Sequence, residues 1–193
     1  MVLDTRSRAE FEAGHIPGAI NIDAPARDQI GVVSRLVGGA KEKAVVLYCN
    51  GPFCQASRRL ADLLVENGFT NVRRYQLGIP VWRALGGPTV VELGGINRIF
   101  KADQTAVYFD ARAADEFAKG SVPGARSAPV DDVMSGKLKK IDLPEDDFNR
   151  RIVLFGRDST QARQLAEFMS KRPWHNVMYF AGTYAELLAG LQQ

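Results

Sequence analysis

The chain has 193 residues, of which 46% are hydrophobic and 24% are charged, and these are values of an ordinary globular protein. Its net charge of +3 is too small to indicate nucleic-acid binding, and its two cysteines are too few for a disulfide scaffold. No apolar stretch approaches the roughly 20 residues that span a bilayer, and no signal peptide is visible after Met1. We therefore expect a cytoplasmic protein that binds neither nucleic acid nor a membrane.

The first half of the chain alternates short apolar runs with helical patterns. We predict strands at residues 2–4, 19–21, 44–49 and 72–76, and helices at residues 8–13, 27–38, 55–66 and 79–85. Unbroken apolar strands that alternate with helices indicate an α/β fold, in which a mostly parallel sheet carries helices on both faces. Ligands of such sheets bind at the carboxyl ends of the strands.

Cys49 lies at that end of a strand, because it closes the third predicted strand shortly before the helix at 55–66. The unpaired backbone N–H groups of a helix N-terminus favour a thiolate, which is the reactive form of cysteine. A buried core cysteine is the alternative interpretation, since free cysteines are among the most buried residues. The position at the carboxyl end of a parallel strand favours the nucleophile.

The second half of the chain repeats the first. Residues 3–6 and 10–19 recur as similar segments at 109–112 and 116–125, in both cases with an offset of 106 residues. The later strand, helix and turn also recur in the same order. Matched segments in a fixed order indicate a tandem repeat.

We therefore predict two domains, at residues 1–88 and 89–193. The second begins with an additional strand and helix that the first lacks. Either another domain or chain covers the exposed edge of the first sheet, or the natural protein begins upstream. Residues 1–88 hold 11 basic against 8 acidic side chains, whereas residues 89–193 hold 14 of each. The positive excess beside Cys49 suits a small anionic substrate.

Three motifs of the first half resemble those of rhodanese domains. The N-terminal signature corresponds to Leu3-Asp4-Thr5-Arg6 together with Gly14-His15-Ile16-Pro17-Gly18-Ala19. The active-site loop corresponds to Tyr48-Cys49-Asn50-Gly51-Pro52-Phe53-Cys54. The C-terminal signature corresponds to the segment from Leu77-Gly78 through Trp82, Gly86 and Pro88. The resemblance implies a tandem of two rhodanese-like domains. It also implies sulfur transfer, in which Cys49 takes a sulfane sulfur from a donor such as thiosulfate, holds it as a persulfide and passes it to a thiol or to cyanide.

The resemblance implies a donor-binding loop around the nucleophile. Backbone N–H groups of this loop can face the sulfur and an anionic donor. Phe53 either shields the persulfide or anchors the loop in the core. The expected site comprises the catalytic Cys49 and the donor-binding residues Asn50, Gly51, Pro52, Phe53, Cys54, Gln55 and Arg58.

The loop departs from the family pattern at Cys54, where many members carry an arginine that helps to bind the donor. Arg58 and Arg59 either replace that arginine or form a solvated face. Cys54 either attacks a Cys49 persulfide or sulfenate to leave a disulfide, or packs under the loop. Phosphatase loops resembling this one are one residue longer and end in arginine. Because Gln55 occupies that position, a phosphatase is disfavoured.

The second copy lacks the nucleophile, because Gly156 aligns with Cys49. We expect it to be inactive, with either a structural role or a partner-binding role. His15 and His175 have no companions at metal-ligand spacing, so we expect no metal, and no motif calls for a cofactor.

The leading hypothesis is a sulfurtransferase that uses a small anionic sulfur donor and a thiol acceptor. The rival is a non-catalytic rhodanese scaffold or a Cys49/Cys54 redox switch. The sequence leaves open whether the protein forms a homo-oligomer or a complex with a partner protein.

Overall fold

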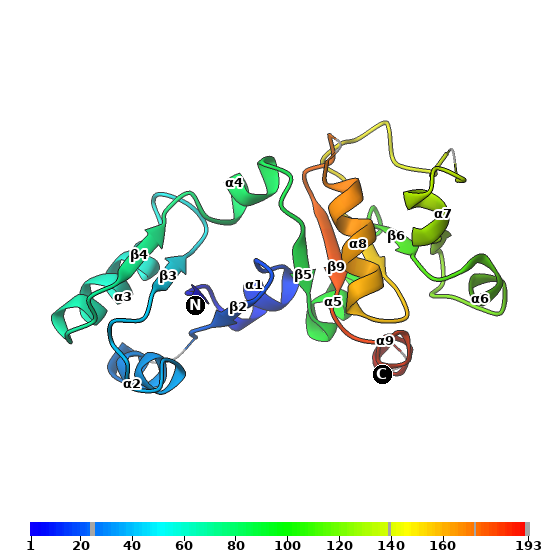
Figure 1. Cartoon of the computed structure of the whole chain (residues 1–193). Coiled ribbons are helices and arrows are strands. Elements are labelled where there is room, and N and C mark those ends of the chain that lie inside the picture. Colours follow the sequence, from blue (N-terminus) through cyan, green and yellow to red (C-terminus); the bar gives the residue numbers. More distant parts are fainter. Residues whose placement is uncertain (24–25, 139, 172, 192–193) are drawn as a thin grey trace. The chain divides into compact units, whose positions relative to one another are not determined.

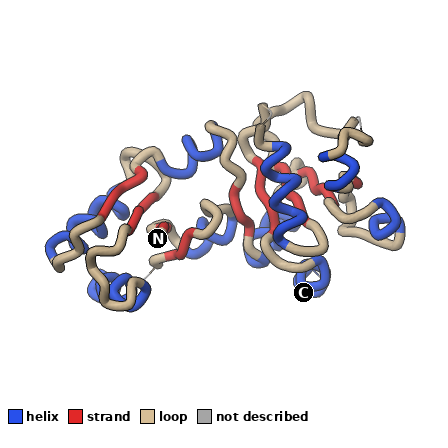
Figure 2. The backbone as a smooth tube through the Cα atoms, in the orientation of Figure 1, coloured by secondary structure: helices blue, strands red, loops and turns tan. Residues whose placement is uncertain are grey.

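The computed structural model describes residues 1–23, 26–138, 140–171 and 173–191. Its contacts divide the chain into two compact units, of which the first holds Met1–Phe11 and His15–Trp82 and the second holds Glu12–Gly14 and Arg83–Gln193. Each unit alternates strands and helices around its own sheet (Figures 1 and 2). The two units are described separately.

The first repeat forms a four-stranded parallel sheet with the strand order β2-β1-β3-β4. Its elements, in chain order, are β1 (Val2–Asp4), α1 (Arg8–Ala13), β2 (Ala19–Asn21), α2 (Ala26–Leu36), β3 (Val45–Tyr48), α3 (Gln55–Glu66), β4 (Val72–Tyr75) and α4 (Gly78–Ala84). Each predicted strand and helix is present, with ends that differ from the prediction by two residues or fewer. The parallel α/β architecture is confirmed.

Alternate side chains of the strands enter two separate apolar clusters, because successive residues of a strand point to opposite faces. Leu3, Val45 and Leu47 pack with side chains of α2 and α3, and among these Leu60 and Leu64 are almost fully buried. On the other face the apolar cluster consists of Ile16, Tyr48 and Ile79, with Val2, Ala19, Tyr75 and Trp82 packed against it. Helices therefore cover both faces of this sheet, and β3 runs through its centre.

The second repeat forms a five-stranded parallel sheet with the order β5-β9-β8-β6-β7. Its elements are β5 (Thr89–Val91), α5 (Leu93–Ala102), β6 (Val107–Asp110), α6 (Ala114–Ala118), β7 (Arg126–Ser127), α7 (Val130–Met134), β8 (Ile152–Phe155), α8 (Ser159–Met169), β9 (Val177–Phe180) and α9 (Tyr184–Leu191). Helices α7 and α8 pack on one face, and α5 and α9 pack on the other.

Strand by strand, the two sheets have the same topology. The order β2-β1-β3-β4 corresponds to β7-β6-β8-β9, and β5 has no counterpart in the first sheet. In the described part of the first repeat, β4 is therefore an edge strand, as expected from the additional strand and helix of the second copy. Among the described helices, none combines the length and the apolar character needed to cross a bilayer.

Candidate active-site loop

The loop from Cys49 to Cys54 joins the carboxyl end of β3 to the N-terminus of α3. Cys49 follows directly on Tyr48, the last residue of β3, and is only 5% exposed. Cys54 occupies the N-cap position of α3, and its backbone N–H donates to the Gly51 carbonyl at 3.1 Å. The loop thus curls back on itself and places both cysteines at one end of the sheet, where ligands of parallel α/β sheets bind.

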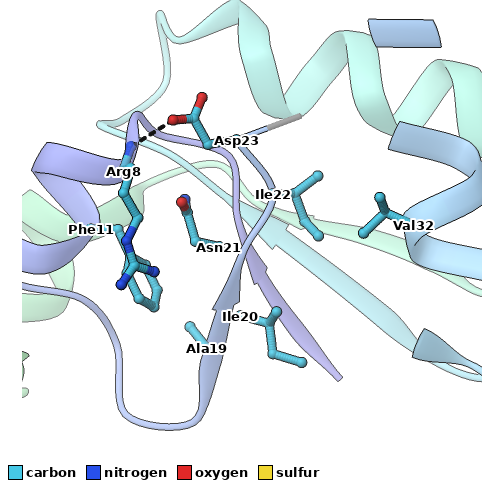
Figure 3. Close-up of a pocket in the computed structure, with 8 residues that line it drawn as sticks. All are labelled: Arg8, Phe11, Ala19, Ile20, Asn21, Ile22, Asp23 and Val32. Carbon is cyan, nitrogen blue, oxygen red and sulfur yellow. Dashed lines mark hydrogen bonds between the residues drawn. The ribbon is translucent and has the colours of Figure 1, made fainter. Parts of the chain in front are cut away.

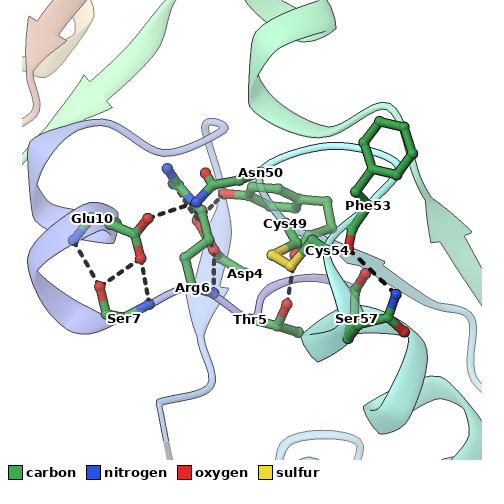
Figure 4. The surroundings of a disulfide bond; sticks show 12 residues. Asp4, Thr5, Arg6, Ser7, Glu10, Cys49, Asn50, Phe53, Cys54 and Ser57 are labelled. Atoms are coloured by element: carbon green, nitrogen blue, oxygen red, sulfur yellow. Dashed lines mark hydrogen bonds and ion pairs between the residues drawn. A yellow bond between two sulfur atoms is a disulfide. The ribbon is translucent and has the colours of Figure 1, made fainter.

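A disulfide joins Cys49 to Cys54, and the two Cα atoms lie 6.1 Å apart (Figure 4). The bond closes a loop with a sequence separation of only five residues, so it joins no distant elements. Of the alternatives for Cys54, pairing with Cys49 is therefore the one seen here. In this oxidised state neither sulfur is a thiolate.

The first turn of α3 adds unpaired backbone donors to the loop. A helix leaves its first N–H groups without intrahelical partners. Cys54 occupies the capping position, and its side chain makes no capping hydrogen bond. Since α3 has 12 residues, its N-terminal partial charge favours a negative charge at the sulfur atoms once the disulfide is reduced.

The first residues of α4 contact the backbone of the Cys49–Cys54 loop. The Ile79 N–H donates to the Cys49 carbonyl at 3.2 Å. Gly78 has φ +61°, and a Cβ at this position would lie 2.1 Å from the Cys49 carbonyl oxygen and 2.7 Å from the Gly51 nitrogen. Only glycine satisfies both the backbone torsion and this close approach. Gly78 therefore fixes the backbone of the loop beside Cys49.

A buried polar network underlies the end of β3. Arg6 donates to Asp4 from Nη2 at 2.6 Å and from Nε at 3.0 Å, and both side chains are almost completely buried. The Tyr48 hydroxyl donates to the same carboxylate at 2.5 Å. Burial, helped by the negative charge of Asp4, raises the pKa of Tyr48, so that its hydroxyl stays protonated and remains a donor. This network positions the residue that precedes Cys49.

Asp110 and Arg112 repeat this pair in the second sheet. Their Nη2–Oδ2 distance is also 2.6 Å. Both pairs are therefore structural, and neither carboxylate is available as a catalytic group. His15 is structural too, because it is buried, stacks on Phe11 and makes a 3.0 Å contact from Nδ1 to the Phe11 carbonyl.

Glu10 places a carboxylate beside the loop. Asn50 donates from Nδ2 to Glu10 Oε1 at 2.6 Å, and the Ser7 hydroxyl donates to Oε2 at 2.6 Å (Figure 4). The hydrogen bond from the Ser7 hydroxyl lowers the pKa of Glu10 most, and the hydrogen bond from Asn50 lowers it further. Burial raises the pKa, but the net shift is downward. Glu10 is therefore ionised at neutral pH and holds Asn50, the residue next to Cys49.

The remaining predicted site residues lie on the outer side of the loop. Phe53 is 92% exposed and points away from the disulfide (Figure 4), so the interpretation that it anchors the loop in the core is wrong. The loop turns outward after Pro52, which is also exposed, and this carries the ring into solvent. Gln55 and Arg58 are exposed on the first turns of α3. Gly51 is buried and has φ +122°, a backbone conformation that glycine adopts more readily than other residues.

The corresponding loop of the second copy is closed by its own side chains. Asp158 caps α8 by accepting from the Gln161 N–H at 3.0 Å, and the Gln161 side chain accepts from the Arg157 N–H at 2.8 Å. A Cβ at Gly156 would lie 2.9 Å from Gln161 Oε1 and 3.1 Å from the Ala162 nitrogen. The second loop therefore lacks both a thiol and free space for one, and a carboxylate already occupies the helix N-terminus.

Restoring a cysteine to the second loop should consequently restore no activity. We expect a Cys49→Ser/Gly156→Cys double variant to take up no sulfane sulfur, because Asp158 and Gln161 occupy the space and the donors that a persulfide needs. Intact mass after incubation with an organic persulfide measures this directly. Sulfur uptake by the double variant at the wild-type rate would show that the closed loop is no barrier.

Three supporting residues were not among the predicted site residues. Thr5 donates its hydroxyl to the Tyr48 carbonyl at 3.0 Å, whereas Glu10 holds Asn50 and Gly78 supports the loop backbone. The repeat carried a signal for Glu10, because Glu116 recurs at the same offset and pairs with Arg157, the residue after Gly156. That parallel identifies an acidic side chain that secures each loop.

A separate open pocket lies along the edge strand β2 (Figure 3). Its lining includes Arg8, Phe11, Ile20 and Asp23, and the Arg8 N–H donates to Asp23 at 2.9 Å. No residue of the Cys49–Cys54 loop contributes to it. Among the described residues, no group of histidine, cysteine, aspartate and glutamate side chains has the geometry to hold a metal.

Sequence comparison agrees with the repeated topology. The profile of the rhodanese-like domain family matches twice, at residues 1–85 and 97–189. The chain belongs to the rhodanese-like domain family. Both repeats of the parallel sheet are thus rhodanese-like domains in tandem, and the Cys49 loop lies in the first of them.

Relatives of a part of the chain occur within larger proteins of different names. An HTH-type transcriptional regulator of Mycobacterium tuberculosis is 33% identical over 87 residues, which are 45% of this chain and 36% of the relative. A tRNA uridine(34) hydroxylase of Photorhabdus laumondii is 31% identical over 81 residues, which are 41% of this chain and 22% of the relative. The chain thus spans about a third or less of the length of these relatives.

Two solved structures are also similar to the chain. A thiosulfate sulfurtransferase from Pseudomonas aeruginosa is 18% identical with a TM-score of 0.40, and the alignment covers 100% of this chain and 39% of that one. A rhodanese-like domain from Anabaena sp. is 30% identical with a TM-score of 0.41, and covers 47% of this chain and 80% of that one.

Proposed function

We propose that the protein is a sulfurtransferase in which Cys49 carries the sulfur as a persulfide. The Cys49 thiolate attacks the sulfane sulfur of a donor, the S–S bond of the donor breaks, and the leaving group departs with the electron pair. With thiosulfate the leaving group is sulfite. An acceptor thiolate or cyanide then attacks the terminal sulfur of the persulfide and regenerates the Cys49 thiolate.

The position of Cys49 carries this proposal. It lies at the carboxyl end of the central strand β3, in a loop that leads to the uncapped N-terminus of α3. A negative charge on the persulfide is stabilised there by backbone donors and the helix dipole, without a metal or a histidine. The family membership of the domain agrees with this chemistry.

The charge at the loop argues for a weakly charged donor rather than for thiosulfate. The position held by Cys54 lacks a cation, and Glu10 contributes an ionised carboxylate to the Asn50 side chain, next to Cys49. Because thiosulfate carries two negative charges, Glu10 opposes its approach. We therefore propose an organic persulfide as the preferred donor, which refines the expectation of a small anionic donor.

Neutralising Glu10 should improve the use of thiosulfate. For Glu10→Gln we expect kcat/KM with thiosulfate to rise about fivefold at low salt, with a smaller gain at high salt, because one repulsive charge near the donor is removed. Thiocyanate formation from thiosulfate and cyanide measures the rate. An alkyl persulfide without other charged groups is the control donor, and its change should be smaller because it carries at most one negative charge. An equal effect on both donors would contradict the electrostatic explanation.

A redox switch is the second candidate, because the Cys49–Cys54 disulfide is present in the structure. A pure switch cycles between dithiol and disulfide and loads no sulfur. The Cys54→Ser variant separates the two functions: a transferase still forms the Cys49 persulfide, whereas a disulfide switch loses its only reaction.

We include a cytoplasmic location in the proposal, since a reducing compartment keeps Cys49 available as a thiolate. We propose a thiol as the physiological acceptor. A contribution of the second domain to partner binding or to oligomer formation is compatible with its closed loop, which supports no transfer of its own.

A further inference from the structure

We propose that Cys54 is a resolving thiol that discharges the Cys49 persulfide as hydrogen sulfide and leaves the Cys49–Cys54 disulfide. The proposal rests on the sulfurtransferase function and names one fate of the transferred sulfur. The first domain would then release sulfide with a dithiol as reductant, and it would also transfer sulfur to thiols or cyanide.

The loop geometry brings the two sulfur atoms together without a rearrangement of the fold. The Cα atoms of Cys49 and Cys54 lie 6.1 Å apart, within the usual range of about 4.4–6.8 Å for disulfides. The Cys54 N–H bond to Gly51 and the Ile79 N–H bond to the Cys49 carbonyl hold the two ends of the loop. The disulfide therefore forms within a loop whose two ends are held by backbone hydrogen bonds.

Cys54 is also placed to act as a nucleophile. It occupies the N-cap position of the 12-residue helix α3, and its side chain makes no capping hydrogen bond. A sulfur at a helix N-terminus is stabilised as a thiolate. The residue that replaces the usual loop arginine thus supplies a second reactive sulfur close to the first.

The proposed step balances without an external oxidant. The Cys54 thiolate attacks Sγ of the Cys49 persulfide, a Cys54–Cys49 S–S bond forms, and the bond between Cys49 Sγ and the terminal sulfur breaks. The terminal sulfur leaves with the electron pair as hydrosulfide. The sulfane sulfur is reduced, and the two cysteines are oxidised to the disulfide.

A dithiol, either a small molecule or a protein, then returns the loop to its reduced state. Cys49 is 5% exposed, whereas Cys54 is only partly buried, so an incoming thiolate reaches the Cys54 sulfur more easily. Attack there releases the Cys49 thiolate first. The second thiol of the reductant resolves the mixed disulfide and frees Cys54, so that each turnover consumes one dithiol and one sulfane sulfur.

A single-turnover experiment tests the role of Cys54. Reduced full-length protein, freed of reductant, is mixed with a slight excess of an alkyl persulfide, and both the protein mass and the released sulfide are followed. We expect each wild-type chain to release a sulfide ion in addition to the sulfide that the donor releases by itself. The final mass of the wild-type protein should be lower than that of the reduced protein by two hydrogen atoms. We expect Cys54→Ser to gain the mass of one sulfur atom, to keep it and to release no sulfide above background.

The outcomes separate this inference from the proposed function. If wild type and Cys54→Ser both retain a stable persulfide, Cys54 does not resolve it and the inference is overturned while the sulfurtransferase stands. If Cys54→Ser gains no sulfur, the proposed function itself fails. A Cys49→Ser control must form no disulfide within the loop and release no sulfide above background, because the sulfur that carries the persulfide is missing.

Discussion

Replacing Cys49 by serine is expected to reduce cyanide-dependent sulfur transfer by a factor of at least about 10³, while the fold survives. The hydroxyl of serine is not ionised at neutral pH and cannot hold a persulfide. The substitution changes one sulfur to oxygen at a site whose loop is held by backbone contacts from Ile79 and by the Asn50–Glu10 bond. Thiocyanate formation from an organic persulfide and cyanide measures the loss, and circular dichroism checks the fold.

Cys54→Ser is the matched control, because it removes the same disulfide and leaves the nucleophile. It should retain transfer to cyanide within about threefold of wild type under reducing conditions, since cyanide attacks the persulfide without help from Cys54. Normal transfer by Cys49→Ser would remove the basis for assigning the persulfide to Cys49.

Removing the carboxylate of Asp4 is expected to destabilise the first domain by about 3–5 kcal/mol. Arg6, whose side chain is only 5% exposed, would lose the carboxylate that accepts from its Nε and Nη2. The Tyr48 hydroxyl would also lose its acceptor. Urea unfolding of Asp4→Ala measures the change, followed by circular dichroism and by tryptophan fluorescence, to which Trp82 of the first domain and Trp174 of the second contribute.

Asp115→Ala is the control for this prediction. Asp115 pairs with Lys119 on the surface, where both side chains are more than 70% exposed, and such pairs contribute little to stability. We expect no measurable shift in the free energy of unfolding. Should Asp4→Ala fail to fold, Asp4→Asn, which keeps the shape of the side chain but removes its charge, is expected to fold with reduced stability. Equal effects of Asp4→Ala and Asp115→Ala would show that burial of the pair is unimportant.

The sequence was sufficient to predict the strands, the helices and the tandem repeat. The strands are short apolar runs such as residues 45–48, and the helices between them have their own apolar spacing. Both patterns are local, so they are visible before the chain is folded. The position of Cys49 at the carboxyl end of β3 followed from the same patterns.

The support of the loop could not be predicted in the same way, because it depends on contacts between distant residues. Glu10 and Asn50 are 40 residues apart in the sequence, and their contact exists only because α1 lies beside the end of β3. The outward direction of Phe53 depends on the path of the loop backbone, so the sequence left open whether the ring shields the persulfide or anchors the loop. Closure of the second loop by Asp158 and Gln161 likewise depends on side-chain hydrogen bonds at the start of α8.

The most direct test of the account is the intact mass of the reduced Cys54→Ser variant after incubation with an organic persulfide and then with cyanide. The account predicts a gain of one sulfur atom that is located on Cys49 by peptide mapping and is removed by cyanide as thiocyanate. An unchanged mass in this variant, with the fold intact, would contradict a sulfur-carrying role for Cys49.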